Sequence, residues 1–329
     1  MDTINTEPAN ILITGAGGFI GQALAASLTK DSAVGSISLT DITEPTVPAL
    51  GNESSCRITS FAADLTSPAT CEEVISAKFT HIYLLHGIMS GAAEANLDLG
   101  LKVNIDSMRY ITDVLRQQKR PNPVRVIFPS SLAVFGPPGE GEVVTENTMP
   151  SPQSSYGTEK AITELLLNDL SRRGLIDARI LRLPTIIVRP GKPTGAASSF
   201  CSGIIREPLN GESSILPVKR DLRLWVCSAR TVIRNLVAAK DIAEAKFPGS
   251  RTVNLPGQTV SVEQMLQGLQ KVGGRKALDL VQEKYDEKVA NIVGSWPALF
   301  DTTKAQKLGF HPDVDLEQTF QHYIEDYMQ

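Results

Sequence analysis

Two side chains in the stretch SSYGTEK, residues 154–160, could act together as an acid–base pair. Tyr156 and Lys160 are four positions apart, which places them on one face if the stretch is helical. A tyrosine hydroxyl has a pKa of about 10, so it can act as a base near neutrality only if its phenolate is stabilised by about 4 kcal/mol. A lysine ammonium one helical turn away supplies part of that stabilisation. A surface tyrosine beside a solvated lysine has the same spacing, so the surrounding sequence must decide between the two interpretations.

A glycine-rich stretch, TGAGGFIG at residues 14–21, follows an apolar run and precedes a helical pattern. Gly15 permits a tight turn, Gly18 lets backbone amides approach a pyrophosphate, and Gly21 lets the helix pack closely on the strand. The N-terminus of that helix would offer unpaired N–H groups and the positive end of its dipole to an anion. Ordinary turns between strands and helices also contain glycine, so a second signal is needed.

Asp41 provides that second signal. It ends the next apolar run, SISLTD at residues 36–41. A carboxylate at this point can accept hydrogen bonds from both ribose hydroxyls of NAD and would repel the extra phosphate of NADP. Together with the glycines it predicts NAD as the cofactor, in preference to a simple turn residue at the end of a strand.

Ser131 lies at the end of another apolar run, VRVIFPSS at residues 124–131, upstream of SSYGTEK. Ligands of doubly wound sheets bind at the carboxyl ends of the strands. Ser131 could therefore hold a substrate hydroxyl or carbonyl oxygen while Tyr156 exchanges its proton. This context favours the catalytic interpretation of Tyr156 and Lys160.

The elements that must position these residues alternate between apolar runs and helical patterns from residue 11 to about 190, as in a parallel sheet with crossover helices. The predicted strands are ILIT (11–14), SISLTD (36–41), RITSFAAD (57–64), HIYLLHG (81–87), VRVIFPSS (124–131) and ARILRLPTIIV (178–188). Helices are predicted after the glycine turn, over residues 97–115, and from about Tyr156 to Gly174. The predicted fold is therefore α/β, with a Rossmann doubly wound parallel sheet in an NAD-binding domain, residues 8–190, that carries the catalytic residues. A smaller C-terminal substrate-binding region, residues 191–329, follows, and some of its segments return to the first domain.

Composition excludes several classes of protein. The 329 residues are 42% hydrophobic and 21% charged, with a net charge of −4. No apolar run reaches the roughly 18 residues of a membrane span, and the polar start does not resemble a secretory signal. No long basic block indicates nucleic-acid binding. The four cysteines are far apart and form no CxxC pair, which favours buried thiols in the cytoplasm and no dedicated metal site.

The motifs resemble those of the extended short-chain dehydrogenase/reductases, the NAD-dependent epimerase/dehydratase family. The stretches that carry the resemblance are TGAGGFIG, Asp41, the Asp64–Leu65 pair, PSSLAVFG, SPQSSYGTEKA and, near the end of the chain, FDTTKAQKLGFHPDVDLEQTF (300–320). The resemblance implies that Ser131, Tyr156 and Lys160 form a catalytic triad, in which Lys160 also binds the nicotinamide ribose. It further implies that Asn104, in KVNIDSMR, completes a proton relay.

The same resemblance implies which residues surround the cofactor. They are Gly15, Gly18, Phe19, Ile20, Gly21, Asp41, Asp64, Leu65, His86, Gly87, Asn104, Tyr156, Lys160, Pro184 and Thr185. His86 and Gly87 stand where the family usually has two small residues. A backbone role beside the cofactor is expected there, while the role of the imidazole stays open.

The implied reaction is a dehydrogenation. Dehydratases of the family usually follow the catalytic serine or threonine with an Asp-Glu pair, whereas Leu132 and Ala133 have no ionisable group. The stretches LRLPTIIVRPGKP (181–193), SSFCSGIIREPLNGE (198–212) and VNLPGQTVSV (253–262) resemble the D-erythronate dehydrogenase group, which acts on small hydroxy acids. The resemblance thus implies oxidation of a secondary hydroxyl of a D-erythronate-like sugar acid to the 2-keto acid. The alternatives are a nucleotide-sugar epimerase or a ketone/alcohol oxidoreductase of specialised metabolism, and a dinucleotide-sensing binding protein is disfavoured by the intact triad.

A sugar-acid substrate needs a cation for its carboxylate and hydroxyl groups around it. The predicted substrate contacts are Ser90, Ser131, Tyr156, Arg189 and Ser199, with Thr185, Ser198, Arg206, Arg223 and Arg230 as further candidates. We expect one or two of these arginines to line the pocket, although for each arginine taken alone a surface position is the favoured interpretation. Family members commonly pair helices equivalent to residues 92–118 and 156–172 across a dimer, so the resemblance also implies a homodimer; the same apolar faces could instead pack on the sheet.

Overall fold

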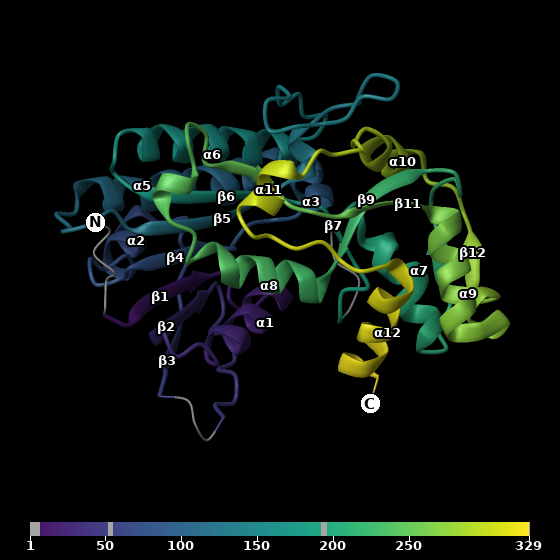
Figure 1. Ribbon diagram of the computed structural model, residues 1–329, viewed down its shortest axis with the longest axis horizontal. Coiled ribbons are helices and arrows are strands. Elements are labelled where there is room, and N and C mark those ends of the chain that lie inside the picture. Colours follow the sequence, from purple (N-terminus) through teal and green to yellow (C-terminus); the bar gives the residue numbers. More distant parts are fainter. Residues whose placement is uncertain (1–6, 52–54, 192–195, 329) are drawn as a thin grey trace.

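A seven-stranded parallel sheet forms the centre of the computed structural model, which describes residues 7–51, 55–191 and 196–328 (Figure 1). The strand order is β10-β6-β5-β4-β1-β2-β3. The strands are β1 (Ala9–Thr14), β2 (Val34–Asp41), β3 (Arg57–Ala62), β4 (His81–Leu84), β5 (Arg125–Ser131), β6 (Asp177–Leu183) and β10 (Thr252–Asn254). Because every neighbouring pair is parallel, all carboxyl ends lie at one edge of the sheet. The order reverses between β1 and β4, where this fold class binds its ligands.

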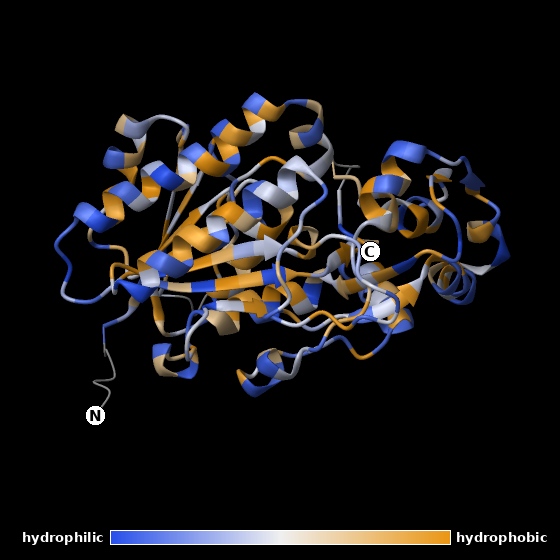
Figure 2. Cartoon of the chain, turned by 90° about the horizontal axis from the view of Figure 1, so that it is seen from above, coloured by the Kyte–Doolittle hydropathy of each residue, from blue (hydrophilic) through white to orange (hydrophobic). Residues whose placement is uncertain are grey.

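Helices cover both faces of this sheet. On one face α1 (Phe19–Leu28) packs beside α8 (Ala229–Ala239), and on the other lie α2 (Pro68–Val74), α5 (Ser107–Gln117) and α6 (Ser155–Arg172) (Figure 1). Strand β1 illustrates the two-residue period: Ile11 and Ile13 join the core under α1 and α8, whereas Leu12 joins the core on the opposite face. Figure 2 shows these strands as mainly hydrophobic and the outer sides of the helices as largely hydrophilic. The buried sheet is the rigid support for the groups at its carboxyl edge.

The helix predicted over residues 97–115 is interrupted. The chain forms α3 (Ser90–Ala95), α4 (Leu97–Leu101), a π-helical turn η1 (Lys102–Asp106) and then α5. Asn104 is the buried residue of the π turn. A π turn inserts one extra residue into a helix and is frequent at functional sites.

The later part of the chain builds smaller sheets beside the large one. Strands β7 (Thr185–Ile187), β9 (Arg223–Ser228) and β11 (Gln258–Ser261) form a mixed sheet, and β8 (Ser214–Leu216) pairs with β12 (Val281–Glu283). Around them lie α7 (Ser199–Leu209), α9 (Val262–Leu278), α10 (Glu287–Gly294) and α12 (Leu316–Tyr327), at the right of Figure 1, whereas α11 (Thr303–Lys307) contacts β10 of the large sheet. Strand β10 and helix α8, from the same part of the sequence, instead join the large sheet and its helical layer.

The single strand predicted over residues 178–188 was wrong. The chain breaks at Pro184, so that β6 lies in the large sheet and β7 in the smaller mixed sheet. Proline lacks the N–H that a continuous ladder needs, which explains the break at this residue. The chain thus leaves the large sheet at the carboxyl edge and starts the second region there.

Two further properties concern only the described part of the chain. None of its helices combines the length and the apolar composition that crossing a membrane requires. Its His, Cys, Asp and Glu residues form no group of three or more that could hold a metal ion.

Candidate active site

The glycine turn between β1 and α1 has the shape of a cradle for a pyrophosphate. Gly15 has a φ of 66°, and a Cβ on it would overlap the backbone of His86 at the end of β4. A Cβ on Gly21 would lie 2.6 Å from Ala16 Cα, so α1 can approach β1 only with glycine there. A Cβ on Gly18 would meet only Gly15 O, at 3.5 Å, and Gly18 is the N-cap of α1 without a capping side chain. The first amides of a helix have no acceptor within the helix, and α1 has no capping side chain, which fits an anionic group.

The two residues after Gly18 point in different directions. Ile20 packs against the core under α1, and Phe19 lines a cavity of about 360 Å³ between α1 and α8. The backbone amides of both residues lie at the start of α1.

Asp41 lies over this turn at the end of β2. Its Oδ2 accepts a hydrogen bond from Gly17 N at 3.0 Å, and its Oδ1 accepts one from Ile42 N at 2.7 Å. The predicted ribose-binding acid is thus fixed beside the glycine turn. Asp64 instead accepts two hydrogen bonds from Thr66 in its own loop, which hold the pKa of its carboxyl below the usual range, and Leu65 beside it is buried.

His86 bridges β1 and α5 at the end of β4. Its Nδ1 lies 2.7 Å from Thr14 Oγ1, and its Nε2 lies 2.9 Å from Ser107 Oγ. Because the Ser107 hydroxyl donates to Val103 O, it accepts from Nε2–H. Thr14 Oγ1 lies within hydrogen-bond distance of both Nδ1 and Tyr83 O, so it is burial that makes the ring neutral. Burial, followed by the charge of Lys160, lowers the pKa of His86 to about 3. His86 therefore connects elements near the cradle and does not exchange protons near neutral pH.

Helix α6 brings Tyr156 and Lys160 to the end of β5. Ser154 Oγ caps α6 by accepting from Gly157 N at 3.2 Å. Lys160 Nζ donates to Pro129 O at 2.9 Å and lies 5.6 Å from the centre of the Tyr156 ring. The two side chains therefore share one face of the helix, beside the strand end that carries Ser131.

Ser131 is fixed by the short 3₁₀ helix η2 (Leu132–Val134) that follows it. Its Oγ accepts a hydrogen bond from Ala133 N at 3.1 Å, so its own hydrogen can point toward a substrate oxygen. A Cβ on Gly157 would overlap Ala133 O, which means that α6 rests directly on η2. This contact sets the spacing between Tyr156 and Ser131.

The pKa values of the pair differ from the sequence-based expectation. Burial, with a smaller contribution from Glu159, raises the pKa of Tyr156 to about 12, and Arg189 opposes this rise. Burial also lowers the pKa of Lys160 to about 8, against the opposing charges of Glu164 and Glu159. In the chain by itself, burial thus outweighs any lowering of the tyrosine pKa by the neighbouring lysine.

Arg189 is the predicted substrate cation that the structure places near Tyr156, since its charge bears on the pKa of the phenol. The preceding Val188 has a φ of 53°, a strained conformation for a β-branched residue. Arg189 N donates to Ser202 Oγ at 3.1 Å, and Arg189 O accepts from Arg206 Nη1 at 2.7 Å. Arg189 is 8% exposed and forms no ion pair with any carboxylate of the described residues. The guanidinium donates from Nε to Ser202 Oγ at 3.4 Å. A buried cation without an acidic partner among the described residues is suited to a carboxylate ligand.

The other candidate arginines have different surroundings. Arg206 forms an ion pair with Glu207, Arg223 is exposed at the start of β9, and Arg230 forms ion pairs with Asp326 and Glu325. Of the predicted hydroxyl groups, Ser90 Oγ is buried and accepts from Ala197 N at 3.0 Å. Pro184 occupies the break between β6 and β7 and Thr185 begins β7, while Ser198 and Ser199 lie at the start of α7.

Sequence reasoning missed Glu159. This acid lies between Tyr156 and Lys160 in the sequence and is 1% exposed. Its Oε2 accepts a hydrogen bond at 2.6 Å from Nδ2 of Asn104, the predicted relay residue, whose amide also bonds to the backbone of Ile88. A glutamate in the first turns of a helix is usually solvent-exposed, so no neighbouring residue in the sequence indicates the contact between Glu159 and Asn104.

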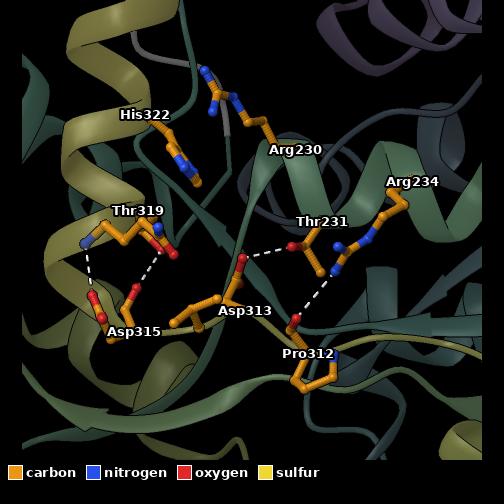
Figure 3. A pocket seen from close by; sticks show the side chains of 10 residues that line it. Arg230, Thr231, Arg234, Pro312, Asp313, Asp315, Thr319 and His322 are labelled. Carbon is orange, nitrogen blue, oxygen red and sulfur yellow. Dashed lines mark hydrogen bonds between the residues drawn. The ribbon is translucent and has the colours of Figure 1, made fainter.

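A cavity of about 250 Å³ lies between α8 and α12 (Figure 3). Arg230, Arg234 and His322 border it, and Asp313 within it already accepts a hydrogen bond from Thr231. Neither this cavity nor the one beside Phe19 is lined by Tyr156 or Lys160. The candidate active site is therefore defined by the strand ends and not by these cavities.

Comparisons with known proteins identify the family of the chain. Residues 11–247 match the model of the NAD dependent epimerase/dehydratase family. The chain is 41% identical to D-erythronate dehydrogenase of Haemophilus influenzae over 96% of this chain and 98% of that protein, and 40% identical, with the same coverage, to D-erythronate dehydrogenase of Cupriavidus necator. A crystal structure of a nucleoside-diphosphate-sugar epimerase from Agrobacterium tumefaciens superposes with a TM-score of 0.91 at 37% identity, covering 98% of this chain and 95% of that one. The chain therefore belongs to the NAD-dependent epimerase/dehydratase family and is an NAD-dependent dehydrogenase of the extended short-chain dehydrogenase/reductase type.

Proposed function

We propose that this enzyme oxidises a secondary hydroxyl of a small sugar acid of the D-erythronate type to the 2-keto acid. The observation that carries the proposal is Arg189, a buried cation without an acidic partner among the described residues, close enough to Tyr156 to bear on its pKa. The similarity to D-erythronate dehydrogenases over nearly the whole chain supports it. A compact sugar acid would present its carboxylate to Arg189 with a hydroxyl within reach of Tyr156.

The cofactor in this proposal is NAD, which when bound supplies the hydride acceptor. The amides of Phe19 and Ile20 would bind its pyrophosphate, Gly18, whose own N–H donates to Gly15 O, would let them approach it, and Asp41 would bind the adenosine ribose. The other residues that would contact it are Gly15, Gly21, Asp64, Leu65, His86, Gly87, Pro184 and Thr185. Lys160 would hold the nicotinamide ribose.

The chain's own residues would carry out the proton transfer. Ser131 would orient the substrate hydroxyl, and Tyr156 would accept its proton as the C–H hydride leaves. The ammonium of Lys160, on the same face of α6, would stabilise the phenolate. Ser90 and Ser199, near the start of the second region, would bind the remaining hydroxyls.

A substrate panel tests the proposal. NADH formation would be followed with four- to six-carbon sugar acids beside UDP-sugars, with Tyr156→Phe as the inactive control. We expect NADH with D-erythronate or a close relative and a rate at least about 100-fold lower for Tyr156→Phe. Turnover of UDP-sugars alone, without net NADH, would show an epimerase instead. Unchanged turnover by Tyr156→Phe with every accepted substrate would disprove the role of the tyrosine.

A further inference from the structure

Glu159 is a buried acid that the proposed chemistry does not use. It shares a helical turn with Tyr156 and Lys160, but its side chain contacts the segment of α4 and η1. A Cβ on Gly100 of α4 would overlap Glu159 Oε1, so the carboxyl group fits only against a glycine. Oε1 is buried without a hydrogen-bond partner among the described residues, and Oε2 accepts the 2.6 Å hydrogen bond from Asn104 Nδ2. Because burying a carboxyl group without hydrogen bonds costs free energy, the single hydrogen bond from Asn104 stabilises Glu159 in this position.

Asn104 also binds the backbone that follows β4. Its Nδ2 also donates to Ile88 O at 3.1 Å, and its Oδ1 accepts from Ile88 N at 2.9 Å. Both amide hydrogens are therefore used. A Cβ on Gly87 would lie 2.8 Å from Asn104 Oδ1, so the two hydrogen bonds between Asn104 and the Ile88 backbone require glycine at position 87. The Gly87–Ile88 backbone follows His86 at the carboxyl edge, where the cofactor is proposed to bind.

We propose that Glu159 is a positioning residue that, through Asn104, fixes the Gly87–Ile88 backbone relative to the turn of α6 that carries Tyr156 and Lys160. A carboxylate is a stronger acceptor than a neutral group, so the hydrogen bond from Asn104 is held at a defined distance. The carboxyl edge of the sheet, where the cofactor is proposed to bind, and helix α6 are then held at a fixed distance from each other. The inference rests on the proposed roles of Tyr156, Lys160 and the end of β4.

The charge of Glu159 provides a second readout. Tyr156 and Lys160 face it from its own helix and Glu94 from α3, whereas η1 and α4 contribute Asn104 and Gly100, which do not titrate. A carboxylate at this place raises the pKa of both Tyr156 and Lys160. Its removal must lower both values, which a purely structural role would not do.

The first test measures NADH affinity by fluorescence titration. Glu159→Ala removes the acceptor of Asn104 and should weaken binding on the order of tenfold. Glu159→Gln keeps an oxygen acceptor and should stay within about threefold of the parent. The double variant Glu159→Ala with Asn104→Ala should bind NADH no more weakly than the single variant that binds it less well, because Glu159 acts through Asn104. Thr158→Ala, on the exposed side of the same turn, is the matched control and should bind as the parent does.

The second test compares the pH dependence of kcat/KM in Glu159→Gln and the parent. The limb of the kcat/KM profile that reports Tyr156 and the limb that reports Lys160 should both move to lower pH in the variant. Parental NADH affinity in Glu159→Ala, additive effects in the double variant, or an unshifted pH profile in Glu159→Gln would each overturn the inference. Should Glu159→Ala fail to fold, the glutamine variant decides through its pH profile. NADH binding needs no substrate, so an error in the substrate assignment would appear separately, as absent turnover by the parent enzyme.

Discussion

At the scale of single residues, Arg189 is the group on which the substrate assignment depends. Arg189→Ala should raise the KM for the sugar acid roughly 10- to 100-fold, because a charge-assisted hydrogen bond to the carboxylate is lost. Its effect on NADH affinity should be small, since no predicted cofactor contact involves it. Arg223→Ala, which removes an exposed arginine of the same region, is the control. An equal loss of NADH and substrate binding in Arg189→Ala would contradict the assignment.

The pKa of Lys160 determines how we expect activity to depend on pH. Burial disfavours its ammonium, and the pKa of about 8 means that Lys160 is charged below that pH and neutral above it. The stabilisation of the Tyr156 phenolate is therefore present below about pH 8 and lost above it. We expect kcat/KM to fall on the alkaline side near this value.

Lys160→Arg keeps the positive charge at all accessible pH values. Whatever activity this variant retains should lack the alkaline fall, as measured from the same kcat/KM profile. An unchanged alkaline limb in Lys160→Arg would show that another group titrates.

At the scale of elements, the contact between α6 and η2 sets the catalytic geometry. Gly157→Ala would force α6 away from Ala133 O, which should lower stability by about 1–3 kcal/mol and reduce kcat more than NADH affinity. Thermal unfolding and steady-state kinetics measure the two effects. Gly294→Ala, in α10 with no atom within 4 Å of the added Cβ, is the matched control and should be tolerated. Full activity of Gly157→Ala would mean that the α6–η2 spacing is not critical.

The elements also show where sequence patterns were sufficient. Strands β1 to β6 lie close to their predicted ranges, mostly because buried parallel strands read as continuous apolar runs, whereas the three-residue strand β10 was not predicted. The π turn at Asn104 and the break at Pro184 were not predicted. Both depend on which neighbouring element a residue contacts, and periodicity does not report that.

At the scale of the whole molecule, we propose a homodimer formed through α4 and α6. These helices contact each other and leave Leu97, Leu101, Ile162 and Leu165 exposed. Burial of such apolar side chains against a second copy would be favourable. Leu165, 70% exposed, is the most accessible of the four.

Leu165→Glu should convert the dimer into monomers, because it places charges in the apolar interface. Light scattering coupled to size-exclusion chromatography gives the mass of 35.5 kDa per chain or twice that value. Val314→Glu changes an equally apolar and 80% exposed residue away from these helices and should leave the dimer intact. A parent protein that is already monomeric would contradict the proposal.

The sequence by itself determined the features whose information is local. The glycine turn, Asp41 and the Tyr156–Lys160 spacing each depend on a few neighbouring residues in a strand–turn–helix context, so they could be recognised without coordinates. Only the tertiary structure distinguished Arg189 from the other arginines, made His86 a neutral bridge and joined Glu159 to Asn104. Burial, ion pairing and hydrogen bonds between different segments, 21 residues apart for His86 and Ser107 and 55 for Asn104 and Glu159, arise only when the elements pack. These interactions decide which of several identical side chains serves the site.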